Sequence, residues 1–241
     1  MAILQLDPDD DDAEDEAQQR IIRQHMADLR ERMRQQGRIV LRDVVNDATA
    51  RAMLDELPDR VWENREELQA TLSRMLIESV EVGVNNAGTV IENGNLGISV
   101  NYDLANEFAR QWAQDHVGEL ISGINETTTR NVRRLTQEWI ASGEALPALR
   151  RRLEPTFGSV RADMIATTEV TRAYAEGNIN LWQTNGLVPA RPGTVPPAHP
   201  RCRCWLVLEY DESTNLFYYV WRTAVDERVC PICLPLDGTR V

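Results

Sequence analysis

Apolar residues recur at every third or fourth position through most of the first 186 residues, a spacing that places them on one face of an α-helix. One run of this kind ends at Gly37, a residue type that commonly follows the last turn of a helix, and another follows Pro58. The apolar positions of the two runs are Ile22, Met26, Leu29 and Met33, and Leu68, Leu72, Leu76 and Val80. The pattern predicts amphipathic helices over residues 20–37, 40–56 and 60–82.

The stretch 83–100 breaks this periodicity. It is rich in glycine and asparagine and contains few apolar residues, a composition typical of loops. We expect a loop or a short hairpin here. It would divide an N-terminal helical region, residues 20–100, from a second helical region, residues 101–186.

The second region is also helical in pattern. Apolar spacing returns at Leu104 and ends at Gly143, and an interruption near Asn125 predicts two antiparallel helices within this stretch. A shorter helix is expected from Pro147, because proline is well tolerated in a first helical turn. A longer helix is expected from Ser159, whose hydroxyl can cap it, to an Asn-Gly pair at its end.

Beyond residue 186 the pattern changes to that of strands. Segments 205–210 and 216–223 are rich in aromatic and β-branched residues and flank a polar turn at 211–215, which predicts a β-hairpin. The predicted fold class is therefore mainly α. A multi-helix body would be followed by a small C-terminal α+β module, residues 187–241, that contains the hairpin.

The N-terminal segment differs from the rest of the chain in its strong negative charge. The net charge is -12, and residues 7–16 carry eight acidic and no basic side chains. Because such a segment cannot bury apolar surface, we predict a disordered acidic arm over residues 1–19. No apolar run approaches the ~20 residues needed to cross a bilayer, and the acidic start is unlike a secretory signal. We therefore expect no membrane segment, and synthesis into the cytoplasm.

All 26 basic residues are arginine, and eight of them gather in the middle of the chain. The net negative charge disfavours a generic nucleic-acid coat protein, which must offset phosphate charge with a basic surface. A local arginine-rich face is still compatible with contacts to DNA or to the carboxylates of a partner. The eight residues are Arg130, Arg133, Arg134, Arg150, Arg151, Arg152, Arg161 and Arg172.

The four cysteines lie in the last fifth of the chain, in two blocks with one histidine. The first block contains His199, Cys202 and Cys204, and the second contains Cys230 and Cys233 as a Cys-x-x-Cys pair. Such a pair presents two thiolates about one tetrahedral edge apart, and a His/Cys element can complete a closed zinc site. We therefore predict one structural zinc ion. Five candidate ligands compete for four places, so either Cys202 or Cys204 is expected to remain a buried thiol.

Two other interpretations of the cysteines were weighed. The even number would allow two disulfides, but cytoplasmic thiols are kept reduced. Cysteines that pack in a core without a metal are the remaining alternative to zinc.

No catalytic or cofactor-binding residue is predicted. A catalytic zinc keeps a bound water near a general base, whereas cysteine-rich coordination is closed. Asp226 and Asp237 are the nearby carboxylates, but their sequence context is that of turn-forming aspartates. We therefore expect that the protein is not an enzyme.

Three blocks of sequence stand out together: IATTEVTRA at 165–173 just after Arg161-Ala162, PPAHPRCRC at 196–204, and WRTAVDERVCPIC at 221–233 followed by LDG at 236–238. With these motifs the chain resembles the phage Mu F-like head-morphogenesis, or minor head protein, family over about residues 101–241. In that family the Cys-x-x-Cys block precedes the His-Pro-x-Cys-Arg-Cys block. Here the order is exchanged, so the module resembles a circular permutation, and we expect the two blocks to be neighbours in space.

The resemblance implies a structural minor head protein of a tailed bacteriophage that acts in capsid and head assembly. The implied partners are the portal protein and the capsid and scaffold proteins, with packaged DNA as a further contact of the arginine-rich face. Such a protein is made in the host cytoplasm and ends in the capsid interior of the virion.

Two other function classes remain open. Domains that resemble this one also occur in effector or toxin-type proteins, but such a protein needs a catalytic domain, for which this sequence shows no motif. A zinc-stabilised DNA-contacting protein could use the arginine-rich middle, although the net charge of -12 disfavours it.

Overall fold

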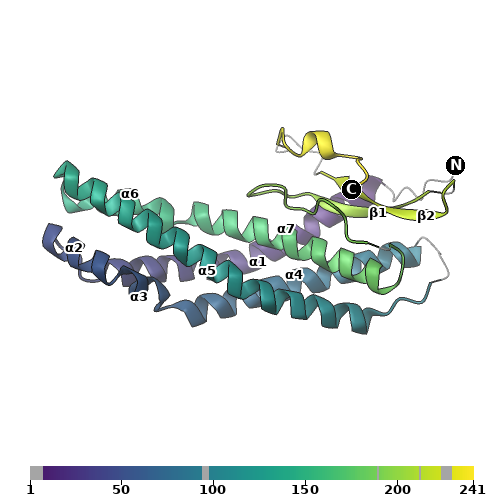
Figure 1. Ribbon diagram of the computed structural model, residues 1–241, viewed down its shortest axis with the longest axis horizontal. Coiled ribbons are helices and arrows are strands. Elements are labelled where there is room, and N and C mark those ends of the chain that lie inside the picture. Colours follow the sequence, from purple (N-terminus) through teal and green to yellow (C-terminus); the bar gives the residue numbers. More distant parts are fainter. Residues whose placement is uncertain (1–7, 94–97, 189, 212, 224–229) are drawn as a thin grey trace. The chain divides into compact units, whose positions relative to one another are not determined.

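The computed structural model describes residues 8–93, 98–188, 190–211, 213–223 and 230–241 (Figure 1). Helices dominate this part of the chain, and a two-stranded antiparallel hairpin follows them, so the predicted fold class is confirmed. The helices are α1 (Pro8–Leu41), α2 (Asp47–Asp55), α3 (Leu57–Trp62), α4 (Arg65–Asn93), α5 (Tyr102–Ser142), α6 (Leu146–Phe157) and α7 (Ser159–Thr184). The strands are β1 (Trp205–Asp211) and β2 (Leu216–Arg222), and a short 3-10 helix, η1, spans Leu234–Leu236. None of the described helices combines the length and apolarity that a bilayer-spanning segment needs.

Helix α1 includes most of the acidic stretch 1–19, for which the sequence predicted a disordered arm; residues 1–7 lie outside the described residues. The helix is stabilised because part of the stretch is buried. Glu14 is 4 % exposed and accepts a 2.7 Å hydrogen bond from the Asn86 side chain of α4, and Gln18 is fully buried. Acidic residues that find buried polar partners can therefore form an ordered helix.

Helix α4 continues to Asn93, although the sequence predicted a loop or hairpin over 83–100. Its glycines allow close packing instead of forming a turn. A Cβ added at Gly83 would collide with the Tyr174 carbonyl of α7, and one added at Gly177 of α7 would collide with the Val80 carbonyl of α4. The two helix backbones approach so closely that only glycine fits at these points.

Helix α5 is continuous where the sequence predicted two antiparallel helices. Asn125, at the predicted break, is 1 % exposed, and its side-chain oxygen accepts a 2.9 Å hydrogen bond from Gln36. The polar residue therefore belongs to a buried network within a helix. Helices α6 and α7 begin as predicted, with Pro147 in the first turn of α6, and Gly186 after α7 has a positive φ of 71°.

The chain forms two compact units. Unit 1 consists of Met1–Gln24, Arg74–Gln114 and Ile165–Val241, and unit 2 consists of His25–Ser73 and Asp115–Met164. Helices α1, α4, α5 and α7 each contribute one segment to unit 1 and one to unit 2. The units therefore do not follow the consecutive regions that the sequence analysis described.

In unit 1 the hairpin shares a core with α7. Tyr174 of α7 packs with Trp205, Val207 and Val220 of the hairpin, all at most 6 % exposed. Strand β1 pairs with β2 from Trp205↔Arg222 to Asp211↔Leu216, and the segment after η1 adds a bridge between Val220 and Arg240. The predicted C-terminal module thus packs as part of unit 1.

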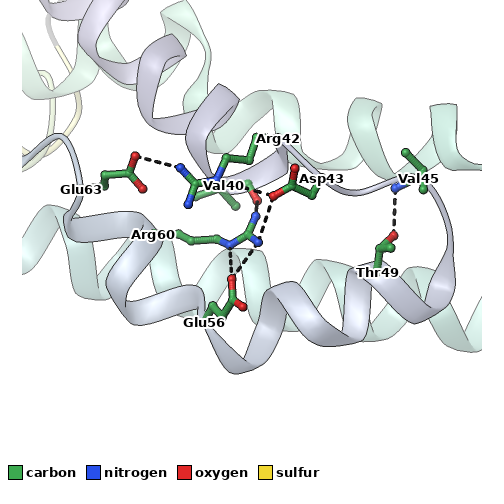
Figure 2. Close-up of polar contacts among 8 residues, drawn as sticks. All are labelled: Val40, Arg42, Asp43, Val45, Thr49, Glu56, Arg60 and Glu63. Atoms are coloured by element: carbon green, nitrogen blue, oxygen red, sulfur yellow. Dashed lines mark hydrogen bonds and ion pairs between the residues drawn. The ribbon is translucent and has the colours of Figure 1, made fainter.

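Unit 2 has a core drawn from α1, α2, α3, α5 and α6. Figure 2 shows a polar cluster at its edge, where Arg60 of α3 donates hydrogen bonds to Glu56 (2.8 Å), to the Val40 carbonyl (3.3 Å) and to Asp43 (3.4 Å). Arg161 is buried and donates to the Thr128 hydroxyl at 2.8 Å. Burial lowers the pKa of Arg161 to about 10. This arginine of the predicted basic group is therefore part of the core and does not belong to an exposed basic face.

Candidate metal centre

The candidate site lies in unit 1, on two turns that flank the hairpin. The His199–Cys202 turn precedes β1, and its backbone is closed by a 3.2 Å hydrogen bond from the Cys202 amide to the His199 carbonyl. The Cys230–Cys233 turn follows β2 and is closed by a 3.1 Å bond from the Cys233 amide to the Cys230 carbonyl. Each turn therefore brings two candidate ligands, three positions apart in the sequence, close together.

The two turns meet through their side chains. Nε2 of His199 lies 2.8 Å from the Cys230 sulfur and 3.0 Å from the Cys233 sulfur. The Cys202 and Cys233 sulfurs are 3.6 Å apart. The ligand atoms of His199, Cys202 and Cys233 all lie within 4.8 Å of one another. The expectation that the two sequence blocks are neighbours in space is confirmed.

All four cysteines are free thiols in the structure. Cys202, Cys204 and Cys233 are buried, whereas Cys230 and His199 are partly exposed. A hydrogen bond from the Cys204 thiol is the main cause that lowers the pKa of Cys202 to about 5. The same pairing raises the pKa of Cys204, and burial together with the nearby Cys202 charge raises that of Cys233 to about 12. Of these three thiols, Cys202 is therefore the one that ionises most readily.

Helix α7 positions the His199–Cys202 turn through two threonines. The Thr171 hydroxyl donates a 2.7 Å hydrogen bond to the Cys202 carbonyl. The Thr168 hydroxyl oxygen accepts a 3.0 Å bond from the amide of Arg201, a residue with a positive φ of 64°. Hydrogen bonds of this kind fix the orientation of a ligand-bearing backbone. The sequence analysis did not assign this role to either threonine.

The structure places the other candidates as follows. The thiol of Cys204 is a hydrogen-bond donor within reach of the Cys202 and Cys233 sulfurs, so it borders the cluster. Asp237 accepts a 3.0 Å hydrogen bond from the Thr223 amide, as expected of a turn-forming aspartate. Asp226 lies outside the described residues.

An imidazole nitrogen and two thiols thus lie within 4.8 Å of one another, and the Cys230 sulfur lies beside the imidazole. Thiolate and imidazole are soft and borderline ligands that bind transition metals well. The cluster of His199, Cys202 and Cys233, with Cys230 beside it, could therefore hold a metal ion.

No model of a known protein family, no curated protein and no solved structure matches this chain.

Proposed function

We propose that His199, Cys202, Cys230 and Cys233 bind one structural zinc ion, and that Cys204 remains a neighbouring thiol. The donor set of one imidazole and three thiolates is typical of closed zinc sites. The 3.6 Å between the Cys202 and Cys233 sulfurs is near the ~3.8 Å that tetrahedral zinc requires between two thiolates. The two His199–sulfur distances are hydrogen-bond distances and would lengthen when a metal binds.

Metal analysis of protein purified without added zinc tests this assignment. The expected result is one zinc per chain. A folded protein with no zinc and four freely titratable thiols would exclude the site.

We further propose that the protein is a structural minor head protein of a tailed bacteriophage and acts by assembly. The supporting observation is the contact of His199 with Cys230 and Cys233, because it joins the two family-like blocks that stand in exchanged order in the sequence. A permuted module needs this juxtaposition if both blocks bind the same metal.

A role in assembly agrees better with the cluster than a role in turnover. Four protein ligands fill a tetrahedral zinc site and leave no position for a reactive water. In the part of the chain that the structure describes, this is the group of side chains that could hold a metal. The proposed partners are the portal, capsid and scaffold proteins, with packaged DNA as a further contact, and the proposed location is the capsid interior.

Co-expression with a phage portal protein and capsid proteins tests the assembly role. The tagged chain is expected to co-purify with procapsids or with the portal protein. Absence of the chain from assembled heads, or hydrolysis of nucleic acid or another substrate by the purified chain, would favour an effector instead.

A further inference from the structure

Trp62, the last residue of α3, is exposed at the surface of unit 2. It is 36 % exposed, whereas four other tryptophans are at most 2 % exposed: Trp139, Trp182, Trp205 and Trp221. The guanidinium of Arg65 lies 5.3 Å from the centre of the Trp62 ring, a cation–π contact. A large aromatic ring is therefore accessible beside a cation.

A hollow of about 550 Å³ lies between Trp62 and one face of α5; we call it the α5–Trp62 hollow. Three arginines of α5 line it, because residues three and four positions apart are neighbours on a helix. They are Arg130, Arg133 and Arg134. All three are exposed.

These arginines are available for a ligand. Among the described residues, none forms an ion pair or hydrogen bond with Arg130 or Arg133, although the chain has 38 acidic residues. Arg134 pairs with Glu138 at 2.9 Å, but the two side chains are 58 % and 46 % exposed. Because exposed pairs of this kind contribute little to stability, a ligand carboxylate can replace Glu138.

Trp62 also borders a second hollow, whose arginines are already paired. Figure 2 shows Arg60 bound to Glu56, and Arg42 bound to Glu63 at 2.9 Å. The unpaired positive charge around Trp62 therefore comes from the α5 face and from Arg65.

We propose that the α5–Trp62 hollow binds a short acidic segment of a partner protein. Carboxylates of the segment pair with Arg130 and Arg133, and an apolar side chain packs against Trp62. Arginine suits this role because its guanidinium binds a carboxylate through two hydrogen bonds, and tryptophan and arginine are enriched among the residues that dominate interface energies. The inference rests on the proposed assembly function, since it gives the chemistry of the partner.

Charge favours a protein segment over a nucleic acid. A polyphosphate chain needs an extended basic track. Here Glu126 lines the hollow itself, and the adjoining hollow contains Glu56, Asp59 and Glu63. Unit 2 contains 15 arginines and 17 acidic residues, so its net charge is -2, which disfavours binding of a long polyphosphate chain. A few carboxylates match the small positive patch.

Fluorescence anisotropy of labelled probes with the full-length protein tests the proposal. The probes are a peptide of glutamate, alanine and leucine, the same peptide with glutamine in place of glutamate, and an oligothymidylate. The glutamate peptide is expected to bind, and the glutamine peptide to bind at least ~10-fold more weakly, because its pairing with arginine lacks charge.

Variants locate the binding site. Arg130→Glu and Arg133→Glu are each expected to weaken binding of the glutamate peptide ~10-fold or more, and Trp62→Ala is expected to weaken it as well. Arg151→Glu is the matched control, because Arg151 is an exposed arginine of α6 outside the hollow and the charge change is the same. Melting curves confirm that each variant is folded.

Three outcomes would overturn the proposal: no binding of the glutamate peptide, an equal loss of binding in Arg151→Glu, or tighter binding of the oligothymidylate through the same arginines. The two proposals fail separately. If the chain enters procapsids but does not bind the peptide, only the proposed binding site at the α5–Trp62 hollow is refuted. If the chain binds the peptide but never enters procapsids, only the assembly role is refuted.

Discussion

At the scale of single residues, Thr171 links helix α7 to the candidate metal centre. Its hydroxyl donates to the Cys202 carbonyl at 2.7 Å and lies 2.9 Å from the Gln18 side chain. Thr171→Val leaves these buried groups without a partner, which costs about 1–3 kcal/mol, and is expected to reduce zinc affinity up to ~10-fold. Competition with a chromophoric chelator measures the affinity.

Thr171→Ser is the control for this prediction. Serine keeps the hydroxyl, so the Ser variant is expected to bind zinc nearly as tightly as the wild type. Equal zinc affinities for the Val and Ser variants would show that the hydrogen bond has no part in positioning Cys202.

The sequence predicted the His/Cys cluster better than the residues that position it. Cysteine and histidine are conspicuous residue types, and their spacing alone indicates a metal site. Thr168 and Thr171 are different, because threonine is common on helices and their partners in the His199–Cys202 turn are about 30 residues away in the chain. Nothing local to the sequence marks such a contact.

At the scale of elements, the close approach of α4 and α7 depends on glycine. Gly83→Ala or Gly177→Ala would drive a methyl group into the backbone of the facing helix. We expect each to lower the free energy of unfolding by about 1–3 kcal/mol or more, because overpacking forces the helices apart. Chemical denaturation measures the change.

Gly118 of α5 provides the matched control. It is exposed, and an added Cβ would meet nothing within 4 Å. Gly118→Ala is therefore expected to stabilise the protein by about 0.5–1 kcal/mol, from helix propensity alone. If Gly83→Ala and Gly118→Ala had the same effect on stability, close packing of α4 on α7 would not explain why α4 remains helical at Gly83.

These glycines also explain which elements could be predicted. The apolar residues at helical spacing in 22–33 and 68–80 are buried, and both ranges lie within helices. The Gly- and Asn-rich stretch after residue 82 has the local composition of a loop, and only its contact with α7, some 90 residues later, makes it helical. A tertiary contact of this kind overrides local propensity.

At the scale of the whole molecule, the hairpin and α7 share one core, so zinc should stabilise unit 1 and not a separate tail. Chelation of zinc is expected to lower the melting temperature by about 10 °C or more. Structural zinc contributes well above ~3 kcal/mol, and each kcal/mol shifts the melting temperature of a domain this large by about 2–4 °C. Thermal melts followed by circular dichroism test this.

Cys230→Ser controls for nonspecific effects of the chelator. This variant should melt at a lower temperature than the wild type, and the chelator should not lower it further. If the chelator leaves the wild-type melting temperature unchanged, the metal has no structural role.

The two units could not be predicted from composition. Their segments are interleaved, because α1, α4, α5 and α7 each run from one unit into the other without a glycine- or proline-rich linker at the change. Domain boundaries are normally recognised by such linkers, so the sequence suggested consecutive regions instead.

The interleaving sets an order for folding during synthesis. Unit 2 needs only residues 25–164, so its segments have all been made before the 77 residues 165–241 of unit 1 are added. At about 5–20 residues per second, that leaves about 4–15 s in which the unit 1 segment of α1 lacks its partners in α7 and the hairpin. Cys230 and Cys233 emerge after every segment of unit 2, so capture of zinc would follow the folding of unit 2, and a ribosome that stalls between residues 164 and 230 would leave a folded unit 2 attached to an open unit 1.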